Sequence, residues 1–410
     1  MPARAPARSY VVPRTLICLL VRILFTFAGG SGHLDPLVPI ARAARAAGHE
    51  VAFAGRPSML PIVTALGFRA YAAGADAGLT PTRLPLQEVD AGREDAAMRD
   101  GFARRIARER ALDILPLCGD WPPDLLVCDE TDFGAIVVGE RLGLPVATVL
   151  TSPVGSFVRR GLVAEPLTEL RAEHGLPPDP ELAMLSRYLV LSPAPASYRD
   201  PAFPLPATAH GVRLFTPEPE PHEHEPHWIA DILEAPTVYV TLGTVFNLES
   251  GDLFARILAG LRDLPANVVV TVGRDIDPAE FGPQPDRVHI ERYIPQSLLL
   301  PHCSLVVSHA GSGSVIGALA HGLPMVLVPM GADQPHNAAR CSELGLARVL
   351  DAVHATPGAL REAGSIQLLD PTCRRAARRM RDEFAALPGP AHAVALLERL
   401  AAERRPLLSA

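Results

Sequence analysis

The sequence predicts an α/β protein of two domains that face each other across a cleft, each built on a parallel sheet, with helices at the C-terminus. Two series of apolar, strand-like runs alternate with helix-like segments, which is the pattern of repeated βαβ units. Between the two series lies a proline-rich stretch with almost no apolar residue, which cannot join either sheet. The length of 410 residues is ample for two hydrophobic cores.

The first series opens with residues 21–27, a β-rich run bounded by glycines that suits a strand buried on both faces. Residues 36–47 follow as a helix, because Leu37, Ile40 and Ala44 share one face and Gly48 can end it. The series continues with strands at 51–54, 124–128 and 146–150 and a helix at 134–142. These elements assign residues 21–215 to the first domain.

Residues 216–228 are rich in Pro, Glu and His, and we expect them to link the domains. The second domain, residues 229–387, repeats the alternation, with strands at 237–242, 268–272, 288–290, 305–308 and 325–329 and helices at 254–261 and 314–321. Residues 371–387 and 391–400 are predicted as C-terminal helices, separated by Pro388-Gly389-Pro390. Whether the last segment, 388–410, returns to the first domain stays open.

The first 20 residues have no place in this fold. The apolar stretch from Thr15 to Ala28 is shorter than a membrane-spanning helix, and it lacks the cleavage pattern of a signal peptide. We therefore expect residues 1–20 to be a non-structural extension, with translation starting at Val21.

Composition excludes several function classes. The net charge of −7 argues against a general nucleic-acid or membrane-binding surface. All 38 basic residues are arginine, so Walker A loops and pyridoxal-phosphate chemistry, which both require lysine, are excluded. The six cysteines form no CxxC pair, which favours reduced thiols in a cytoplasmic protein.

The turn Ser308-His309-Ala310-Gly311-Ser312-Gly313-Ser314 lies between a predicted strand and a predicted helix. Its small residues let a ligand approach the backbone, and N–H groups at a helix N-terminus favour phosphate. The next loop, residues 329–337, contains Asp333 and Gln334, a carboxylate beside an amide that suits sugar hydroxyls. Diphosphate in one loop and polyol in the next indicate a nucleotide sugar as co-substrate, with no other cofactor.

These residues resemble the donor-binding signature of the GT-B glycosyltransferases, in the UDP-glycosyltransferase-like superfamily and its bacterial antibiotic and natural-product branch. The resemblance spans residues 21 to about 400 and implies two facing Rossmann-like domains. It also implies that Tyr293 and Ile294 flank the nucleobase and that His309 and the backbone of 311–314 hold the diphosphate. The acidic loop, residues 329–337, would bind the sugar through Asp333 and Gln334. The full set of donor-binding residues that the resemblance implies is Gly243, Thr244, Tyr293, Ile294, Gln296, His309, Gly311, Ser312, Gly313, Ser314, Asp333 and Gln334.

In the first domain, His33 follows the turn Gly29-Gly30-Ser31-Gly32 and should face the cleft. We expect the nearby helix N-terminus to keep the ring neutral, as a general base requires. The resemblance implies that His33 deprotonates an acceptor hydroxyl and that Asp129 orients it, with Asp132 as a substitute. The reaction would then be an inverting displacement that needs no metal.

One departure from the family bears on the donor. Members that use UDP-sugars commonly carry a Glu eight residues after the diphosphate His, where it pairs with the ribose hydroxyls, and here that residue is Gly317. We therefore favour a dTDP-deoxysugar, with a UDP-hexose as the alternative. The acceptor is expected to be a small hydrophobic aglycone that contacts residues 79–86, 98–106 and 152–162.

Rival interpretations differ in class. A nicotinamide-dependent oxidoreductase lacks the third glycine of the fingerprint, and Glu50 precedes the second strand instead of closing it. A non-catalytic partner of another glycosyltransferase would tend to lose the donor residues that persist here. A homodimer is left open, and partners other than the donor and the aglycone, nucleic acid and membrane included, are not expected.

Overall fold

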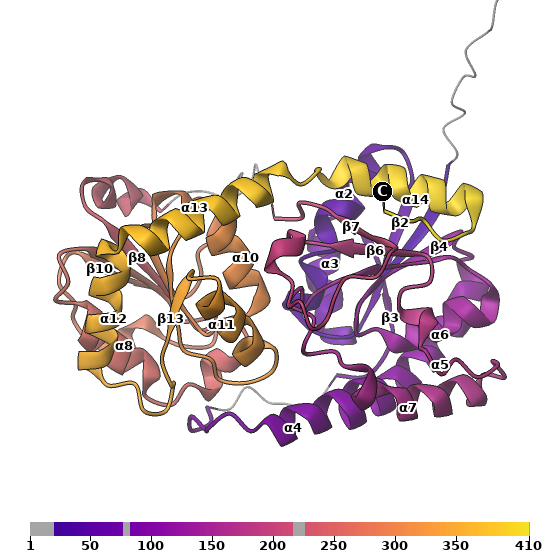
Figure 1. Cartoon of the computed structure of the whole chain (residues 1–410), viewed down its shortest axis with the longest axis horizontal. Coiled ribbons are helices and arrows are strands. Elements are labelled where there is room, and N and C mark those ends of the chain that lie inside the picture. Colours follow the sequence, from indigo (N-terminus) through magenta and orange to yellow (C-terminus); the bar gives the residue numbers. More distant parts are fainter. Residues whose placement is uncertain (1–19, 77–82, 216–225, 410) are drawn as a thin grey trace, which may run out of the picture.

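The computed structural model describes residues 20–76, 83–215 and 226–409. Two parallel sheets of seven and six strands form two lobes that lie side by side (Figure 1). The predicted α/β class, with two sheets and C-terminal helices, is confirmed. Nearly all of the predicted extension 1–20, and most of the predicted linker 216–228, lie outside the described residues.

The sheet of the first domain has the strand order β3-β2-β1-β4-β5-β6-β7. Its strands are β1 (Arg22–Thr26), β2 (Glu50–Gly55), β3 (Arg69–Ala72), β4 (Leu125–Asp129), β5 (Val146–Val149), β6 (Leu189–Ser192) and β7 (Ala209–Gly211). Its helices are α1 (Ser31–Leu34), α2 (Val38–Ala46), α3 (Leu60–Ala65), α4 (Ala91–Ala96), a π-helix (Ala97–Ile106), α5 (Ala107–Asp120), α6 (Phe133–Leu142) and α7 (Arg160–Glu173). Short 3₁₀ turns lie at 57–59, 183–185 and 196–198.

The sheet of the second domain has the order β10-β9-β8-β11-β12-β13. Its strands are β8 (Thr237–Thr241), β9 (Asn267–Thr271), β10 (Val288–Glu291), β11 (Leu305–Ser308), β12 (Met325–Leu327) and β13 (Ala347–Val349). Its helices are α8 (Leu253–Leu261), α9 (Gln296–Leu299), α10 (Ser312–Ala320), α11 (Gln334–Glu343), α12 (Pro357–Leu369) and α13 (Pro371–Ala386), with 3₁₀ turns at 227–234, 246–249, 278–281 and 300–302.

Alternate residues of β1 feed two different cores. Ile23 and Phe25 join a core that contains α2, whereas Leu24 joins a core on the opposite face that contains α5 and α6. This period of two follows from strand geometry, and burial of both faces explains the near-continuous apolar run in the sequence. Helices cover both faces of the sheet, which leaves the loops at the carboxyl ends of the strands free to form a site.

The helix predicted over 36–47 is present as α2, although it begins two residues later, at Val38, and ends one residue earlier, at Ala46, while the separate α1 ends at Leu34. Pro36 has no N–H with which to continue the hydrogen-bond ladder, and Pro39 lies in the first turn of α2, where proline is tolerated. The helix predicted from Ser314 begins two residues earlier, at Ser312.

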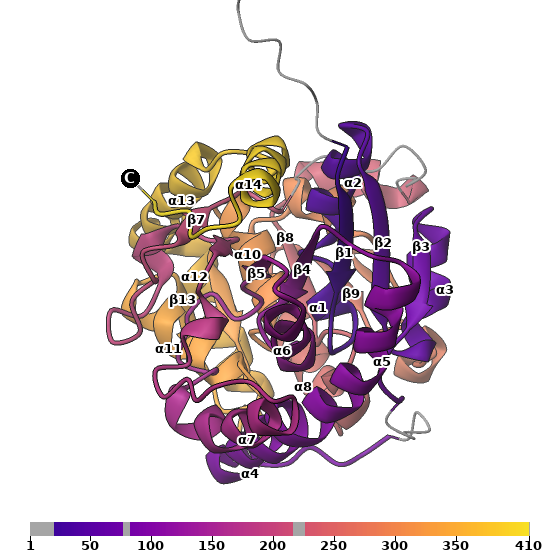
Figure 2. The same cartoon turned by 90° about the vertical axis from the view of Figure 1, so that its right-hand side faces the viewer.

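The last helix, α14 (Pro390–Glu403), lies on the first domain and not on the second. It packs against α2, and its residues Ala393, Leu397 and Leu400 are part of the same core as β1. Figures 1 and 2 show α13 on the second domain and α14 along the edge of the first. Trp228, the last residue of the predicted linker, is already buried in the core of the second domain.

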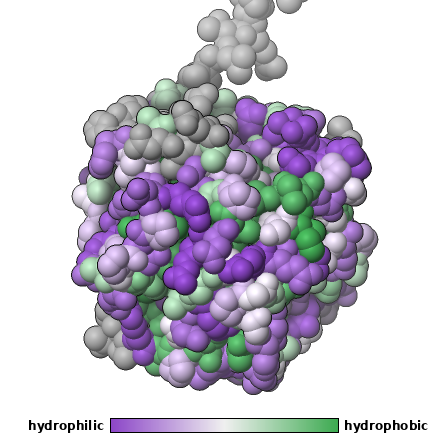
Figure 3. Space-filling view, turned by 90° about the vertical axis from the view of Figure 1, so that its left-hand side faces the viewer, coloured by the Kyte–Doolittle hydropathy of each residue, from purple (hydrophilic) through white to green (hydrophobic). Residues whose placement is uncertain are grey.

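The outer face of the second domain carries mainly hydrophilic side chains, broken by smaller hydrophobic groups, as Figure 3 shows. Such a mixture is usual for a solvated surface. Within the described ranges, no helix combines the length and the apolar character needed to cross a membrane.

Candidate active site

The first half of the site forms where β1 and β4 end side by side. The two strands are parallel neighbours, with Thr26 opposite Cys128, so the turn after β1 and the end of β4 meet at one edge of the sheet. That turn carries His33, and β4 ends at Asp129. The carboxyl edge of a parallel sheet is the usual place for a ligand site.

His33 and Asp129 are joined at this edge. The Nδ1 atom of His33 lies 3.2 Å from Oδ1 of Asp129, and the other carboxylate oxygen accepts the N–H of Ala28 at 2.6 Å. The Thr131 hydroxyl donates to Oδ1 of Asp129 at 2.6 Å and lies 3.2 Å from the same Nδ1. The Asp129 side chain is fully buried, whereas 24% of the His33 side chain is exposed. The sequence had indicated His33 and Asp129 but not Thr131.

The pKa shift of His33 differs in direction from the expectation. Burial lowers the pKa of His33, but the charge and the hydrogen bond of Asp129, together with the charges of Glu130 and Asp333, outweigh burial, so the pKa is raised. The pKa of Asp129 is lowered. Burial alone would raise it, but the contacts with His33, Thr131 and the N–H of Ala28 outweigh burial. The helix N-terminus was expected to lower this pKa of His33, but the shift has the opposite direction, because α1 has only four residues and Asp129 is in direct contact.

Two neighbours fix the position of the His33 ring. A Cβ atom on Gly29 would lie 2.4 Å from Nε2 of His33, so the ring requires glycine beneath it. Phe102 stacks on the ring with centroids 5.7 Å apart and an interplanar angle of 20°. Phe102 belongs to the π-helix, a conformation that is frequent at functional sites. The sequence had indicated segment 98–106 for acceptor contacts, but it gave no signal for this stacking.

Asp132 does not replace Asp129. Its carboxylate forms a buried pair with Arg110, at 2.8 Å to Nε and 2.6 Å to Nη2, and accepts the N–H of Ala135. Arg110 also donates to the carbonyls of Ala54 and Ala73, so it ties three strand ends together. The role of Asp132 is therefore structural, and the proposal that it could orient His33 is wrong.

The second half of the site lies at the ends of β8 and β11. Cβ atoms placed on Gly243 and on Gly311 would each lie 2.5 Å from Nε2 of His309, so both residues must be glycine for the imidazole to fit. Burial lowers the pKa of His309 to about 4. The ring is therefore neutral at physiological pH and can donate one hydrogen bond without carrying a charge.

The turn before α10 exposes its backbone. Gly311 is the N-cap and gives no side-chain cap to the helix, and Gly313 is exposed. The first N–H groups of a helix have no partner within it, which makes this end suited to an anion. Ser314 is buried, whereas Thr244, on the neighbouring turn after β8, is exposed.

Asp333 is tied to the same turn. The Ser312 hydroxyl donates to its Oδ2 at 2.6 Å, and the Asn337 amide donates to Oδ2 at 2.9 Å and to the carbonyl of Ala310 at 3.0 Å. Burial raises the pKa of Asp333, against the effect of these donors. Gln334 uses its side-chain oxygen within the protein, where it accepts the N–H groups of residues 330 and 331. The bridging role of Asn337 was missed by sequence reasoning.

The residues indicated for the nucleobase have unlike surroundings. The Tyr293 side chain is 53% exposed and lies under the Arg274 guanidinium, whose carbon is 4.7 Å from the ring centroid, whereas Ile294 is buried in the core. Gln296 begins α9, and its side-chain oxygen would lie 2.8 Å from a Cβ on Gly317.

The two halves of the site approach each other across the interdomain boundary. The Ser156 hydroxyl of the first domain lies 3.0 Å from Nδ1 of His336, which belongs to α11 in the second domain. Asp333 is close enough to contribute to the raised pKa of His33. The structure therefore brings the loop of the second domain that holds Asp333 close to His33 of the first domain.

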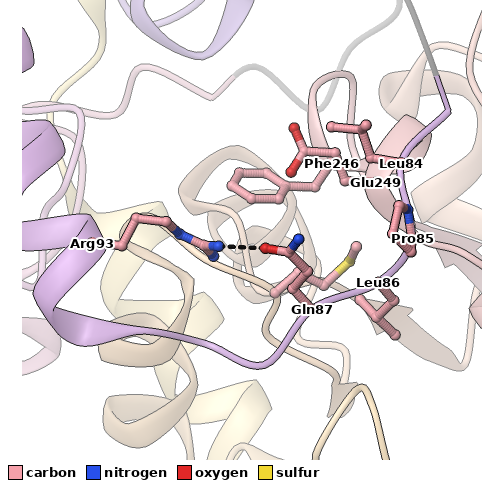
Figure 4. Close-up of a pocket in the computed structure, with 8 residues that line it drawn as sticks. Leu84, Pro85, Leu86, Gln87, Arg93, Phe246 and Glu249 are labelled. Atoms are coloured by element: carbon pink, nitrogen blue, oxygen red, sulfur yellow. Dashed lines mark hydrogen bonds between the residues drawn. The ribbon is translucent and has the colours of Figure 1, made fainter.

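Residues 83–94 of the first domain, here called the crossing segment, reach the second domain. The N–H of Leu84 donates to the carbonyl of Leu248 at 2.9 Å, and Arg83 pairs with Glu280 at 2.7 Å. A cavity of about 50 Å³ lies between this segment and Phe246. Figure 4 shows the side chains that line it. A Cβ on Gly331 would lie 2.8 Å from Phe246 and 3.1 Å from Glu94, so the segment packs closely on the loop that holds Asp333.

Comparison with known proteins agrees with this geometry. A family model described as "Erythromycin biosynthesis protein CIII-like, C-terminal domain" matches residues 255–400. The chain is 32% identical to 4'-demethylrebeccamycin synthase of Lentzea aerocolonigenes, in an alignment that covers 92% of this chain and 99% of that protein. The chain belongs to the bacterial antibiotic and natural-product glycosyltransferases. The predicted family is thereby confirmed.

Two further relatives match this chain over nearly its full length. The chain is 29% identical to 3-alpha-mycarosylerythronolide B desosaminyl transferase of Saccharopolyspora erythraea, over 94% of this chain and 99% of that protein. The solved structure of the glycosyltransferase VinC in complex with dTDP is similar with a TM-score of 0.74 and 26% identity, covering 93% of this chain and all of that one. The GT-B fold of the enzyme is confirmed. In the part of the glycosyltransferase that the structure describes, no three His, Cys, Asp or Glu side chains cluster as metal ligands would.

Proposed function

We propose that this glycosyltransferase moves a deoxysugar from a dTDP-linked donor to a hydroxyl group of a hydrophobic natural-product aglycone, with inversion at the anomeric carbon. The observation that carries the proposal is the His33–Asp129 pair, which faces the acidic loop of the donor domain. The similarity to a desosaminyl transferase and to a dTDP complex supports the same donor class.

In this mechanism, His33 removes the proton of the acceptor hydroxyl as its oxygen attacks the anomeric carbon. Asp129 holds Nδ1 of the ring, which leaves Nε2 as the atom that receives the proton. The imidazolium that forms is stabilised by the same carboxylate. The nucleoside diphosphate leaves as the new bond forms, and no covalent enzyme intermediate is required.

The leaving diphosphate gains negative charge, which the turn 311–314 and His309 would stabilise. N–H groups at the start of α10, together with Thr244 and the backbone of Gly243, are fixed donors that need no reorganisation. Comparable donors in other enzymes contribute about 10²–10³-fold each. We propose that they perform this task without a metal ion, so that activity is unchanged by EDTA.

The donor sugar would contact Asp333 and Gln334. The carboxylate of Asp333 is fixed by Ser312 and Asn337, so it is oriented before a sugar arrives. Tyr293 and Ile294 would flank the nucleobase, where the exposed Tyr293 ring offers a face for stacking.

The choice of dTDP over UDP rests on Gly317. The space next to its Cα is filled by the Gln296 side chain, Leu300 and Phe215, at 2.8 to 3.2 Å from an added Cβ. A glutamate at position 317 would clash with these groups. Position 317 therefore supplies no carboxylate that could pair with a ribose 2'-hydroxyl. Loss of this partner suits a nucleotide whose sugar lacks that hydroxyl.

Competition titration tests the proposal. Isothermal titration calorimetry with dTDP and UDP should give tighter binding of dTDP, and mass spectrometry with a panel of dTDP-sugars and aglycones should detect a glycoside. Tighter binding of UDP would support the UDP-hexose alternative. Binding of dTDP without turnover of any pair in the panel would favour a non-catalytic partner.

A further inference from the structure

A small cavity borders the turn that carries His33. It holds about 40 Å³, lies beyond the carboxyl ends of β2 and β3, and is lined by Ala28, Arg56, Gly74, Arg105, Glu109 and Arg110, among others. In this measure about 10–15 Å³ accommodates one water, so the cavity has room for about three heavy atoms. Nothing in the proposed mechanism uses it.

Three arginines line this cavity, and two of them are neutralised. Arg110 is paired with buried Asp132, and Arg105 lies 3.4 Å from Glu109. Arg56 forms no ion pair and no hydrogen bond through its side chain with any described residue, and its Nε is buried without a partner. The cavity therefore carries one uncompensated positive charge.

A buried polar atom without a partner is unfavourable, and most such atoms in proteins are satisfied by a ligand, water or another side chain. A guanidinium offers parallel N–H groups that match the two oxygens of a carboxylate. A carboxylate group has three heavy atoms, which fits the available space. The charge, the geometry of the donor and the volume thus point to the same chemical group.

The position of Arg56 connects this cavity to the reaction. A Cβ on Gly30 would lie 3.2 Å from Nη2 of Arg56, and a Cβ on the preceding Gly29 would lie 2.4 Å from Nε2 of His33. Because consecutive Cα atoms are about 3.8 Å apart, the two nitrogens are separated by at most about 12 Å. One fused-ring aromatic molecule can span that separation.

We propose that the Arg56 cavity binds a carboxylate of the acceptor while His33 faces the hydroxyl group that is glycosylated. The acceptor is then an acidic aglycone whose carboxylate reaches Arg56 while its reactive hydroxyl lies at His33. This inference rests on the proposed function, in which His33 marks the acceptor site.

The test compares 7-hydroxycoumarin-3-carboxylate with its ethyl ester, which is similar in shape but uncharged. Fluorescence titration should show the carboxylate binding at least tenfold more tightly than the ester to the unmodified protein. Arg56→Gln should remove this preference and leave the affinity for the ester within about twofold. The matched control is Arg69→Gln, because Arg69 is an exposed arginine at the opposite end of β3, and this variant should behave as the unmodified protein.

The proposal would be overturned if the unmodified protein bound the acid and the ester equally well, or if it bound neither. It would also be overturned if Arg56→Gln weakened the binding of the acid and of the ester to the same extent. Titration with dTDP is run on every variant and should give the same affinity, which shows that the donor domain is intact. If no variant binds dTDP, the proposed function fails, while the comparison of acid and ester still decides the role of Arg56.

Discussion

The carboxylate of Asp129 contacts Nδ1 of His33 at 3.2 Å while its second oxygen holds the N–H of Ala28, in the strand-to-turn connection that carries His33. One buried side chain thus fixes both the ring and the backbone leading to it. A disturbance of Asp129 should therefore change the orientation of the base as well as its charge.

Replacement of the base gives the most direct test. His33→Ala should lower kcat for O-glycosylation by about 10²–10⁴-fold, the range of general base catalysis, because it removes the imidazole that Asp129 and Thr131 contact. The affinity for dTDP should stay within about twofold, since His33 belongs to the other domain. Calorimetry and product analysis measure the two effects separately, and a loss of both would contradict the assigned role.

The pH dependence follows from the raised pKa of His33. The base must be neutral to accept a proton, so kcat should fall as the pH drops through a pKa that lies above the ordinary value of 6.5. Asp129→Asn removes the charge that raises this pKa and leaves burial, which lowers it. The acid limb of the pH profile should therefore move to lower pH while the maximal rate also falls; an unmoved limb would show that another group titrates.

The diphosphate turn can be tested by adding one methyl group. A Cβ on Gly313 would meet no protein atom within 4 Å, so Gly313→Ala should fold normally and place its methyl group in the space proposed for the diphosphate. We expect the affinity for dTDP to fall at least tenfold. Gly161→Ala, at a helical glycine that is equally open but lies in the first domain, is the control and should leave this affinity unchanged. Unchanged binding by both variants would place the diphosphate elsewhere.

The buried pair of Arg110 and Asp132 should matter for stability. Arg110→Ala leaves a buried carboxylate without its charged partner and removes a donor to the carbonyls of Ala54 and Ala73, which costs about 3–5 kcal/mol. Arg108→Ala removes an arginine of the same helix whose pairs with Glu169 and Glu173 are partly exposed, and should cost below about 1 kcal/mol. Urea unfolding followed by circular dichroism measures both, and equal losses would contradict a special role of the buried pair.

The sequence was most informative where the fold repeats a simple pattern. The apolar runs of β1, β4, β8 and β11 predicted central strands, and the turns after them predicted the site, because parallel strands expose their carboxyl ends at one edge. Short edge strands such as β7 and β13, of three residues each, gave no such run. Their existence depends on pairing with a neighbour that is distant in sequence.

Contacts within the site depended on tertiary structure. Phe102 stacks on His33 although the two residues are 69 positions apart in the chain, and the sequence of residues 97–106 had not indicated a π-helix. The direction of the pKa shift of His33 was mispredicted because a helix-dipole argument was applied to a helix of four residues, where a carboxylate in direct contact has the larger effect.

The position of α14 has a consequence for how the polypeptide acquires its structure during synthesis. The hydrophobic core beneath α2 is completed by residues near 390–407, so the N-terminal half emerging from the ribosome lacks part of its own interior until those residues are made. Separate expression of residues 21–215 should accordingly yield an aggregation-prone fragment. Fusing the missing helix to this fragment is the way to obtain an isolated first domain.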